Sequence, residues 1–213
     1  MTVQSYPKGV DKTVVQQDLV ARIQTLHAEG MPWNAMQVLT PIRRGLLGTE
    51  ALNPLLRDLM NPAWPHQPTW TAQGGLSYRV GDRVKNAYGK NVFNGDMGVV
   101  TSIRPDPTDD DEDDRLWVRF VDQTVVFTAD EARDLRLAYA TTVHKAQGSE
   151  YPVVIFPLMY DAYVMLHRNL VYTAMTRARE RLYLFTEASA LWLALKRGDG
   201  ADRQTKLPEL VLQ

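Results

Sequence analysis

The stretch YATTVHKAQGSEYPVVIFP at residues 139–157 decides the fold class of this 213-residue chain. An apolar run ends in a cluster of polar residues and one glycine, and a second apolar run follows directly. The polar cluster consists of Thr141, Thr142, His144, Lys145, Gln147, Gly148, Ser149 and Glu150. In α/β sheets, ligands bind beyond the carboxyl ends of strands, where N–H groups, hydroxyls and a glycine approach phosphates closely. The pattern therefore predicts an anion site, although an ordinary loop between sheet elements has a similar composition.

Three apolar strand-like runs, LRLAYATTV, YPVVIFPLM and RLYLFTE, lie within residues 135–187 and alternate with helix-compatible segments. This alternation is typical of a parallel sheet covered on both faces. A further buried strand, QVLT at 37–40, finds suitable partners only after residue 135. We therefore expect one α/β domain that is interrupted by an insertion.

The interrupting region carries five short β-like runs between residues 76 and 128, which are LSYRV, DRVKNAY, MGVVTSI, RLWVRF and TVVFT. Short strands separated by Gly, Asn and Asp predict a small β-barrel. Residues 61–73 hold three Pro and two Trp without periodicity and indicate a linker or ordered loop. The predicted division is α/β domain at 1–73, inserted barrel at 74–134, α/β domain again at 135–197, and a tail at 198–213.

Two helices are predicted before the insertion. Residues 12–29 place four apolar side chains at helical spacing, with Asp11 as N-cap and Gly30 just past the end. The four are Val15, Leu19, Ile23 and Leu26. The second helix begins at Thr49, or at Asn53 with Pro54 in the first turn, and ends before Pro62.

The segment HRNLVYTAMTRARERLYLF at 167–185 predicts an amphipathic helix with Leu170, Ala174 and Ala178 on one face. Three arginines, Arg177, Arg179 and Arg181, lie near its end, before a strand. They are compatible with simple compensation of the helix dipole. The functional interpretation is an arginine finger, whose planar fork stabilises charge on a transferring phosphoryl group.

The composition bounds the remaining possibilities. With 24 Lys and Arg against 25 Asp and Glu, the net charge is −1, so a nucleic-acid site must be local. The absence of Cys excludes disulfides, Cys-ligated zinc and a Cys nucleophile, and four scattered His predict no metal site. We expect a cytoplasmic protein without membrane contact, because no apolar run is long enough and no signal peptide is recognisable. The acidic run DPTDDDEDD at 106–114 indicates a solvated hairpin tip, with a metal site as the alternative.

Four segments resemble known motifs in family order. TTVHKAQGSEYPVVI is similar to motif V and LVYTAMTRARERLYL to motif VI of superfamily 1 DNA helicases, and HKAQGSEY is most similar to RecD-type enzymes, the family of the exodeoxyribonuclease V alpha subunit. VLTPIRRGLLGTEALN at 38–53 resembles motif IV of that family, and GDRVKNAYGKNVFNGDMGVV at 81–100 resembles the block leading into its inserted barrel. The resemblance implies a RecA-like motor domain of the P-loop NTPase type, interrupted by a Src-homology-3-like barrel. It also implies an ATP-dependent DNA helicase that moves in the 5′ to 3′ direction.

The resemblance assigns nucleotide roles residue by residue. Arg177 resembles the motif VI arginine that reaches the γ-phosphate, with Arg179 as the second choice. Either Arg43 or Arg44 resembles the phosphate sensor of motif IV. Gly148 resembles a backbone N–H donor to the nucleotide, and Glu150 resembles the group at the ribose or the catalytic water.

The resemblance also implies contacts to DNA. Thr142 and His144 resemble residues that contact single-strand phosphates, and Lys145 adds positive charge. Contacts to the backbone position a strand without reading its sequence, which suits a translocating motor. Trp64, Trp70 and Tyr88 are able to stack on bases, but aromatic residues more often fill cores, so we do not assign them.

One half of an ATPase is missing from the sequence. The loop pattern GxxxxGK[ST] is absent, because Gly89-Lys90 is followed by Asn91 and Val84 stands where the first glycine belongs. No apolar strand leads into an acidic Mg²⁺-binding pair. We therefore expect this chain alone to be inactive as an ATPase and to bind neither ATP nor Mg²⁺ tightly.

The expected partners are single-stranded DNA and an N-terminal RecA-like motor domain, supplied by the same chain or by a partner, since such ATP sites form between two domains. A fragment of a larger helicase is favoured over a separate docking protein. Two alternatives stay open: a non-catalytic DNA-binding or protein-binding module whose barrel holds a partner, and a helicase domain linked to a relaxase or nuclease.

Overall fold

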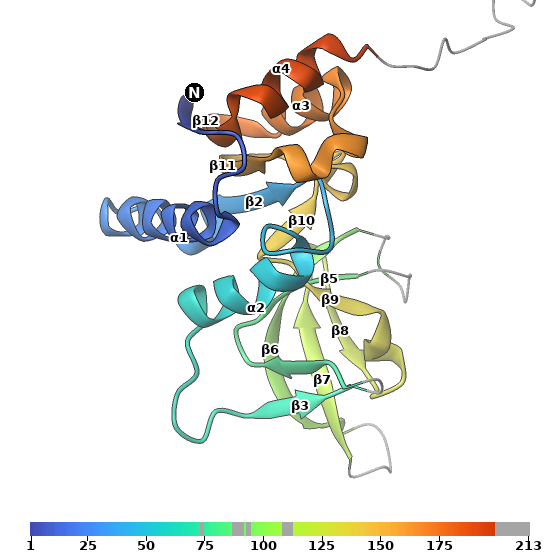
Figure 1. Cartoon of the computed structure of the whole chain (residues 1–213). Coiled ribbons are helices and arrows are strands. Elements are labelled where there is room, and N and C mark those ends of the chain that lie inside the picture. Colours follow the sequence, from blue (N-terminus) through green and yellow to red (C-terminus); the bar gives the residue numbers. More distant parts are fainter. Residues whose placement is uncertain (73–74, 87–91, 93–94, 108–112, 199–213) are drawn as a thin grey trace, which may run out of the picture.

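The computed structural model describes residues 1–72, 75–86, 92, 95–107 and 113–198. Its centre is a parallel sheet in the order β1-β12-β11-β2-β10 (Figure 1). The strands are β1 (Thr2–Tyr6), β2 (Met36–Thr40), β10 (Ala140–Thr142), β11 (Tyr151–Leu158) and β12 (Ala178–Glu187). β2 pairs with β10 and β11, as predicted for a strand whose partners follow the insertion. The α/β parallel-sheet fold is thus confirmed.

Helices cover both faces of this sheet. α1 (Lys12–Ala28) and α2 (Thr49–Met60) pack on one face. α3 (Arg168–Met175), α4 (Ala188–Lys196) and the 3-10 segment η4 (Tyr160–Met165) pack on the other. Two buried apolar layers therefore lie on the two faces of the sheet, which explains why its central strands β2 and β11 are buried along almost their whole length.

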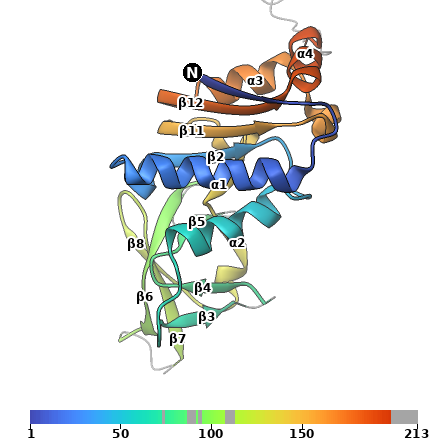
Figure 2. The same cartoon turned by 60° about the vertical axis from the view of Figure 1, so that its left-hand side comes forward.

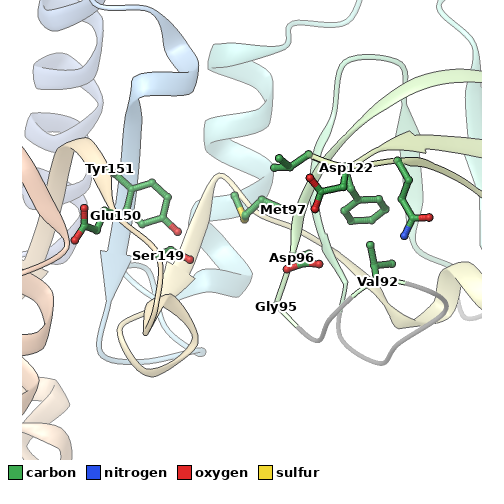
Figure 3. Close-up of a pocket in the computed structure, with 11 residues that line it drawn as sticks. Val92, Gly95, Asp96, Met97, Asp122, Ser149, Glu150 and Tyr151 are labelled. Atoms are coloured by element: carbon green, nitrogen blue, oxygen red, sulfur yellow. The ribbon is translucent and has the colours of Figure 1, made fainter.

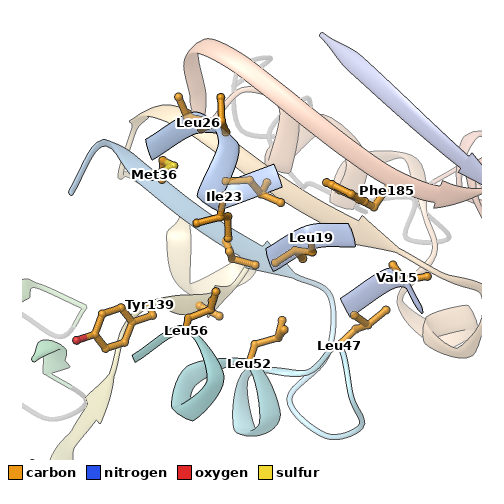
Figure 4. Packing of buried hydrophobic residues seen from close by; sticks show 14 of the residues in the cluster. Val15, Leu19, Ile23, Leu26, Met36, Leu47, Leu52, Leu56, Tyr139 and Phe185 are labelled. Carbon is orange, nitrogen blue, oxygen red and sulfur yellow. The ribbon is translucent and has the colours of Figure 1, made fainter. Parts of the chain in front are cut away.

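α1 forms as its sequence predicts. The Asp11 carboxylate accepts a hydrogen bond from the Thr13 N–H at 2.9 Å, and Gly30 has a φ of +93° just after the helix. The expected apolar stripe is buried against β2, β12 and α2 (Figure 4). Capping and burial of one stripe together fix this helix on the sheet.

α2 begins at Thr49, so Pro54 lies inside the helix. The buried Asn53 amide pairs with the edge strand β10: its Nδ2 donates to the Ala140 carbonyl at 3.0 Å, and its Oδ1 accepts from the Ala140 N–H at 2.9 Å. The side chain thereby takes the place of a neighbouring strand and ties α2 to the strand that precedes the polar loop.

The inserted region contains an antiparallel sheet in the order β8-β7-β6-β5-β9, beside the β10 edge of the parallel sheet (Figures 1 and 2). Its strands are β5 (Arg83–Asn86), β6 (Met97–Pro105), β7 (Asp114–Arg119), β8 (Thr124–Phe127) and β9 (Leu135–Leu137). β3 (Thr69–Thr71) and β4 (Ser77–Arg79) form a separate two-stranded ribbon. A core of its own lies around Tyr78, Leu116 and Phe127.

Several sequence expectations for individual elements were wrong. β1 was missed, and residues 69–71, expected as loop, form a strand. β9, expected in the parallel sheet, pairs with β5 of the inserted sheet, because the run at 135–143 changes sheets at Ala138 and Tyr139. The helix expected to continue past Ala178 ends at Met175, because pairing of β12 with β11 begins at Ala178.

Some predictions fall on parts that the structure does not describe. They concern Tyr88, the Gly89-Lys90 pair, the centre of the acidic run at 108–112, and the tail beyond Gly198. Within the described residues, no group of three or more His, Asp or Glu is arranged to hold a metal ion. No described helix has both the length and the apolar character needed to cross a membrane.

Candidate functional site

The polar loop at 143–150 connects β10 to β11. It runs from the edge of the sheet where the strands end, the carboxyl edge, to the edge where they begin, the amino edge. It leaves the carboxyl end of β10 beside Thr40 and enters the amino end of β11 at Tyr151. Because β11 and β2 are parallel, with Ile155 opposite Val38, Glu150 lies roughly 20 Å from Thr40 along the strands, at about 3.3 Å per residue. The polar residues that we expected to form one anion site therefore lie in two groups at opposite edges, which we call half-sites.

The first half-site follows β10. The Val143 N–H donates to the Thr40 carbonyl at 3.1 Å, and a short 3-10 turn, η3 (His144–Ala146), follows. His144 and Lys145 are exposed, and Thr142 is half-buried. The three DNA-contact candidates thus lie close together along the chain, with Thr142 at the end of β10 and His144 and Lys145 on the exposed turn that follows.

The second half-site precedes β11. Gly148 has a φ of +84°, and an added Cβ would have no neighbour within 4 Å, so its backbone is open to a ligand. The Glu150 carboxylate lies 3.8 Å from the Arg179 guanidinium, and both side chains are more than half exposed, at 60% and 66%. A water-exposed pair at this distance is weak and easily exchanged for another partner.

Arg177 is anchored beside this pair. Its guanidinium donates to the Ser149 carbonyl at 3.0 Å, the Thr173 carbonyl at 3.3 Å and the Thr176 hydroxyl at 3.2 Å. Its own carbonyl accepts from the Tyr151 N–H at 2.8 Å. Arg177 therefore connects the end of α3 to the start of β11 and remains half-buried.

A β-bulge directs Arg179 outward. Tyr151 is opposite Ala178, but Val153 is opposite Arg181, so β12 holds one extra residue there. Pro152 lies at this irregularity and has no N–H to give to the ladder. Bulges of this kind reorient side chains, and the residues from Arg179 to Arg181 are exposed.

The loop after β2 displays Arg43 and Arg44, and both are exposed. Its shape depends on Gly48, where an added Cβ would lie 2.4 Å from the Arg43 carbonyl oxygen. The Arg43 guanidinium lies 3.6 Å from the Glu50 carboxylate. This loop follows the carboxyl end of β2, so the structure does not bring either arginine next to Glu150 or Arg177.

At the carboxyl end of β12, the edge of the sheet is covered by residues of the chain that bond to Glu187. The Glu187 carboxylate, 1% exposed, accepts from the Gly9 N–H at 2.9 Å, the Tyr160 N–H at 2.8 Å and the Lys12 ammonium at 3.1 Å. Burial raises the pKa of Glu187, but these hydrogen bonds outweigh it and the pKa lies below its ordinary value.

A pocket of about 510 Å³ separates the second half-site from the inserted sheet (Figure 3). Ser149, Glu150 and Tyr151 line one side, and residues 95–97 and 120–123 line the other. Burial raises the pKa of the Tyr151 hydroxyl. Sequence reasoning did not find the contributions of the inserted sheet, since no spacing pattern relates them to the loop.

The inserted sheet is fixed to the parallel sheet by charged residues of one strand and the turn before it. The Asp82 carboxylate, fully buried, accepts from the Tyr139 hydroxyl at 3.0 Å and from the Asn61 amide at 3.0 Å. The Arg83 guanidinium donates to the Met36 carbonyl at 3.0 Å. Lys85 donates to the Lys145 carbonyl in the polar loop.

Two family models match separate parts of the chain. The UvrD-like helicase C-terminal domain matches residues 137–185, which contain both half-sites of the polar loop and the three arginines. The ATP-dependent RecD-like DNA helicase SH3 domain matches residues 52–120, most of the inserted region. Together with the parallel sheet, these matches define a RecA-like helicase domain with an inserted Src-homology-3-like barrel.

Curated relatives identify the family. The ATP-dependent RecD2 DNA helicase of Deinococcus radiodurans is 41% identical over 186 residues, which cover 83% of this chain and 23% of that protein. The RecBCD enzyme subunit RecD of Haemophilus influenzae is 24% identical over 182 residues, covering 84% of this chain and 25% of that protein. The chain belongs to the RecD-type superfamily 1 helicases and corresponds to their C-terminal part. It spans about a quarter of the length of these relatives.

Solved structures with a similar fold include Pif1 helicases. The Candida albicans enzyme has a TM-score of 0.49 and 16% sequence identity, over 85% of this chain and 55% of that one. Bacteroides Pif1 bound to single-stranded DNA has a TM-score of 0.46 and 18% identity, over 70% of this chain and 40% of that one.

Proposed function

We propose that this chain is the second motor domain of an ATP-dependent DNA helicase, which completes an ATP cleft together with an N-terminal motor domain. The observation that carries the proposal is the meeting of motif V and motif VI at the amino edge of the sheet. There Glu150 and Arg179 form an exposed pair beside Arg177. Cationic groups at such an edge are able to face a nucleotide held by another domain.

The residues at this edge fit a magnesium-bound triphosphate. ATP with Mg²⁺, held by the first motor domain, would supply the phosphoryl group whose transfer to water drives movement. Arg177 has donors bonded to the Ser149 and Thr173 carbonyls, and a phosphate oxygen is a stronger acceptor for a guanidinium. Glu150 would act at the ribose or at the catalytic water, Gly148 would offer its open backbone N–H, and Arg179 is the second choice for the finger.

Arg43 and Arg44 stay candidates for the phosphate sensor through the family resemblance alone, since their loop follows the carboxyl end of β2 and lies away from Glu150 and Arg177. Their loop is ordered by Gly48, and neither guanidinium is buried. Substituting each arginine separately with Ala, in a protein that contains both motor domains, decides between them. The sensor variant should lower ATP hydrolysis, and the other variant should not.

The DNA-binding role is assigned to Thr142, His144 and Lys145. Thr142 ends β10, and His144 and Lys145 lie on the exposed turn after it, so that a hydroxyl, a ring N–H and an ammonium are able to contact successive phosphates. Relatives named as DNA helicases support this assignment. The 5′ to 3′ direction is part of the same proposal and rests on the family resemblance alone.

The finger assignment is tested by Arg177→Ala in a protein completed with a first motor domain. DNA-stimulated ATP hydrolysis should fall by much more than about tenfold, because such fingers contribute about 10³-fold to 10⁵-fold. Arg181→Ala is the matched control, since Arg181 is an exposed arginine of β12, four residues after Arg177, with no assigned role. A loss of less than about tenfold in Arg177→Ala would show that Arg177 is not the finger.

The DNA assignment is tested on the chain itself by titration with single-stranded DNA at two salt concentrations. Binding should depend on DNA length, weaken with salt and be lost on substitution of Thr142 and His144 with Ala. Binding that survives both substitutions and maps to the barrel would instead support a non-catalytic binding module.

A further inference from the structure

A lysine of the inserted barrel contacts the loop that carries the proposed DNA contacts. Lys85 lies on β5, which is flanked by β6 and β9 in the antiparallel sheet. Lys85 is only 6% exposed, and its ammonium donates a hydrogen bond to the Lys145 carbonyl. The contact therefore joins the barrel to the polar loop through two residues that are 60 positions apart in the sequence.

This hydrogen bond adds to the backbone hydrogen bonds that shape the turn. The Ala146 N–H donates to the Val143 carbonyl, the Gln147 N–H to the His144 carbonyl and the Ser149 N–H to the Ala146 carbonyl, at 3.1–3.3 Å. The Lys145 carbonyl instead accepts its hydrogen bond from Lys85 of the barrel. The turn that presents His144 and Lys145 is thus fixed partly by a side chain of another domain.

The position is unfavourable for a lysine without such a partner. Burial and the nearby Lys145 charge lower the pKa of Lys85 to about 8, and only Asp96 counteracts them. The space is also confined, since a Cβ added at Gly95 would lie 3.4 Å from the Lys85 Cε. A buried ammonium needs compensating groups, and the Lys145 carbonyl and the nearby Asp96 charge supply them here.

Lys85 does not itself present its charge to solvent. Lys85 is buried and its ammonium donates one hydrogen bond to a backbone carbonyl, whereas the exposed cation of the turn is Lys145. A direct role in binding phosphate would require an accessible ammonium. The geometry therefore favours an indirect role through the backbone of the turn.

We propose that Lys85 is a positioning residue by which the barrel holds the motif V turn in the conformation that binds single-stranded DNA. The proposal rests on the proposed function of Thr142, His144 and Lys145. It makes the barrel part of the DNA-binding machinery of the motor without placing any barrel atom on the DNA.

Two variants of the full chain test this role. Lys85→Met keeps the apolar stem and removes the donor, and Lys85→Arg restores a donor. Arg119→Met is the matched control, since it removes an exposed cation from β7 of the same barrel. Thermal unfolding confirms that each variant is folded, and replacement of a buried ammonium by Met should not prevent folding.

The first measurement is hydrogen exchange of the turn without DNA. The amides of Ala146, Gln147 and Ser149 should exchange faster in Lys85→Met than in the unsubstituted chain, and Lys85→Arg should restore slow exchange. Unchanged exchange in Lys85→Met would overturn the proposal, whether or not the chain binds DNA. This readout separates failure of the Lys85 contact from failure of the proposed function.

The second measurement is the affinity for single-stranded DNA as a function of salt. Lys85→Met should weaken binding about threefold to tenfold, Lys85→Arg should recover most of the loss, and Arg119→Met should stay within about twofold. The slope of log affinity against log salt should not change. A slope reduced by about 0.7 would mean that Lys85 itself neutralises a phosphate and would overturn the positioning role, as would unchanged affinity.

Discussion

The two edges of the parallel sheet carry similar charged groups in opposite states. At the carboxyl edge, Glu187 is buried and bonded to two backbone N–H groups and Lys12. At the amino edge, Glu150 and Arg179 are exposed and loosely paired. A carboxylate that stabilises a fold is enclosed and fully bonded, whereas one available to a ligand is exposed and weakly held. We therefore propose that this domain faces a nucleotide with its amino edge.

The contrast between the two glutamates predicts the largest difference in stability. Glu187→Ala should lower the free energy of unfolding by roughly 3 kcal/mol, because it leaves Lys12 and two N–H groups without their acceptor. Glu150→Ala should lower it by less than about 0.5 kcal/mol. Urea titration of both variants measures this, and equal losses would remove the distinction between the edges.

The two glycines of the loops should differ next. Gly48→Ala should lower the free energy of unfolding by about 2 kcal/mol, because its Cβ meets the Arg43 carbonyl oxygen at 2.4 Å. Gly148→Ala meets no neighbour and should lose about 1 kcal/mol through its positive φ alone. Thermal unfolding of the pair is the measurement, and a larger loss for Gly148→Ala would contradict the open loop.

The two glutamates should also differ in how much they contribute to the pH dependence of stability. The pKa of Glu187 is lowered in the folded state, so its contribution is present above about pH 4.5 and is lost as the pH falls through the folded-state value. Glu187→Gln should therefore flatten the decline in stability between about pH 5 and pH 3. Parallel denaturant titrations with the Glu150→Gln control check this, and an unchanged decline in Glu187→Gln would argue against the buried site.

The exposed ion pair gives the smallest expected effect. A double-mutant cycle with Glu150→Gln and Arg179→Gln should report a coupling below about 0.5 kcal/mol, since both side chains are mostly in water. Denaturant unfolding of the four proteins measures it. Coupling above about 1 kcal/mol would mean that the pair holds the fold and is not free for a ligand.

Much of the fold follows from local sequence signals. Asp11, the apolar stripe of α1 and Gly30 behave as predicted, because capping and helical periodicity act within a few residues. The change of sheet at Ala138 and Tyr139 was not predictable, since one apolar run serves two sheets and only pairing with β5 and β2 divides it. Likewise, α3 ends at Met175 because the chain from Ala178 onward pairs with β11 as strand β12.

The grouping of the candidate residues follows from the motifs, but their geometry does not. The family resemblance names Glu150, Arg177 and Arg179, and the structure brings these three residues together. The separation of Thr142 from Glu150 depends on the direction of β10 and β11, which the loop sequence does not reveal. Lys85 was missed, because its contact with Lys145 joins residues with no common pattern.

Hydrogen exchange of a protein completed with a first motor domain tests the central claim most directly, with and without a non-hydrolysable ATP analogue. We predict that the analogue slows exchange at residues 148–150 and 177–179. The amides of Gly9 and Tyr160, already bonded to Glu187, should not change. Slowing confined to Gly9 and Tyr160, with none at the amino edge, would contradict the claim that this edge faces the nucleotide.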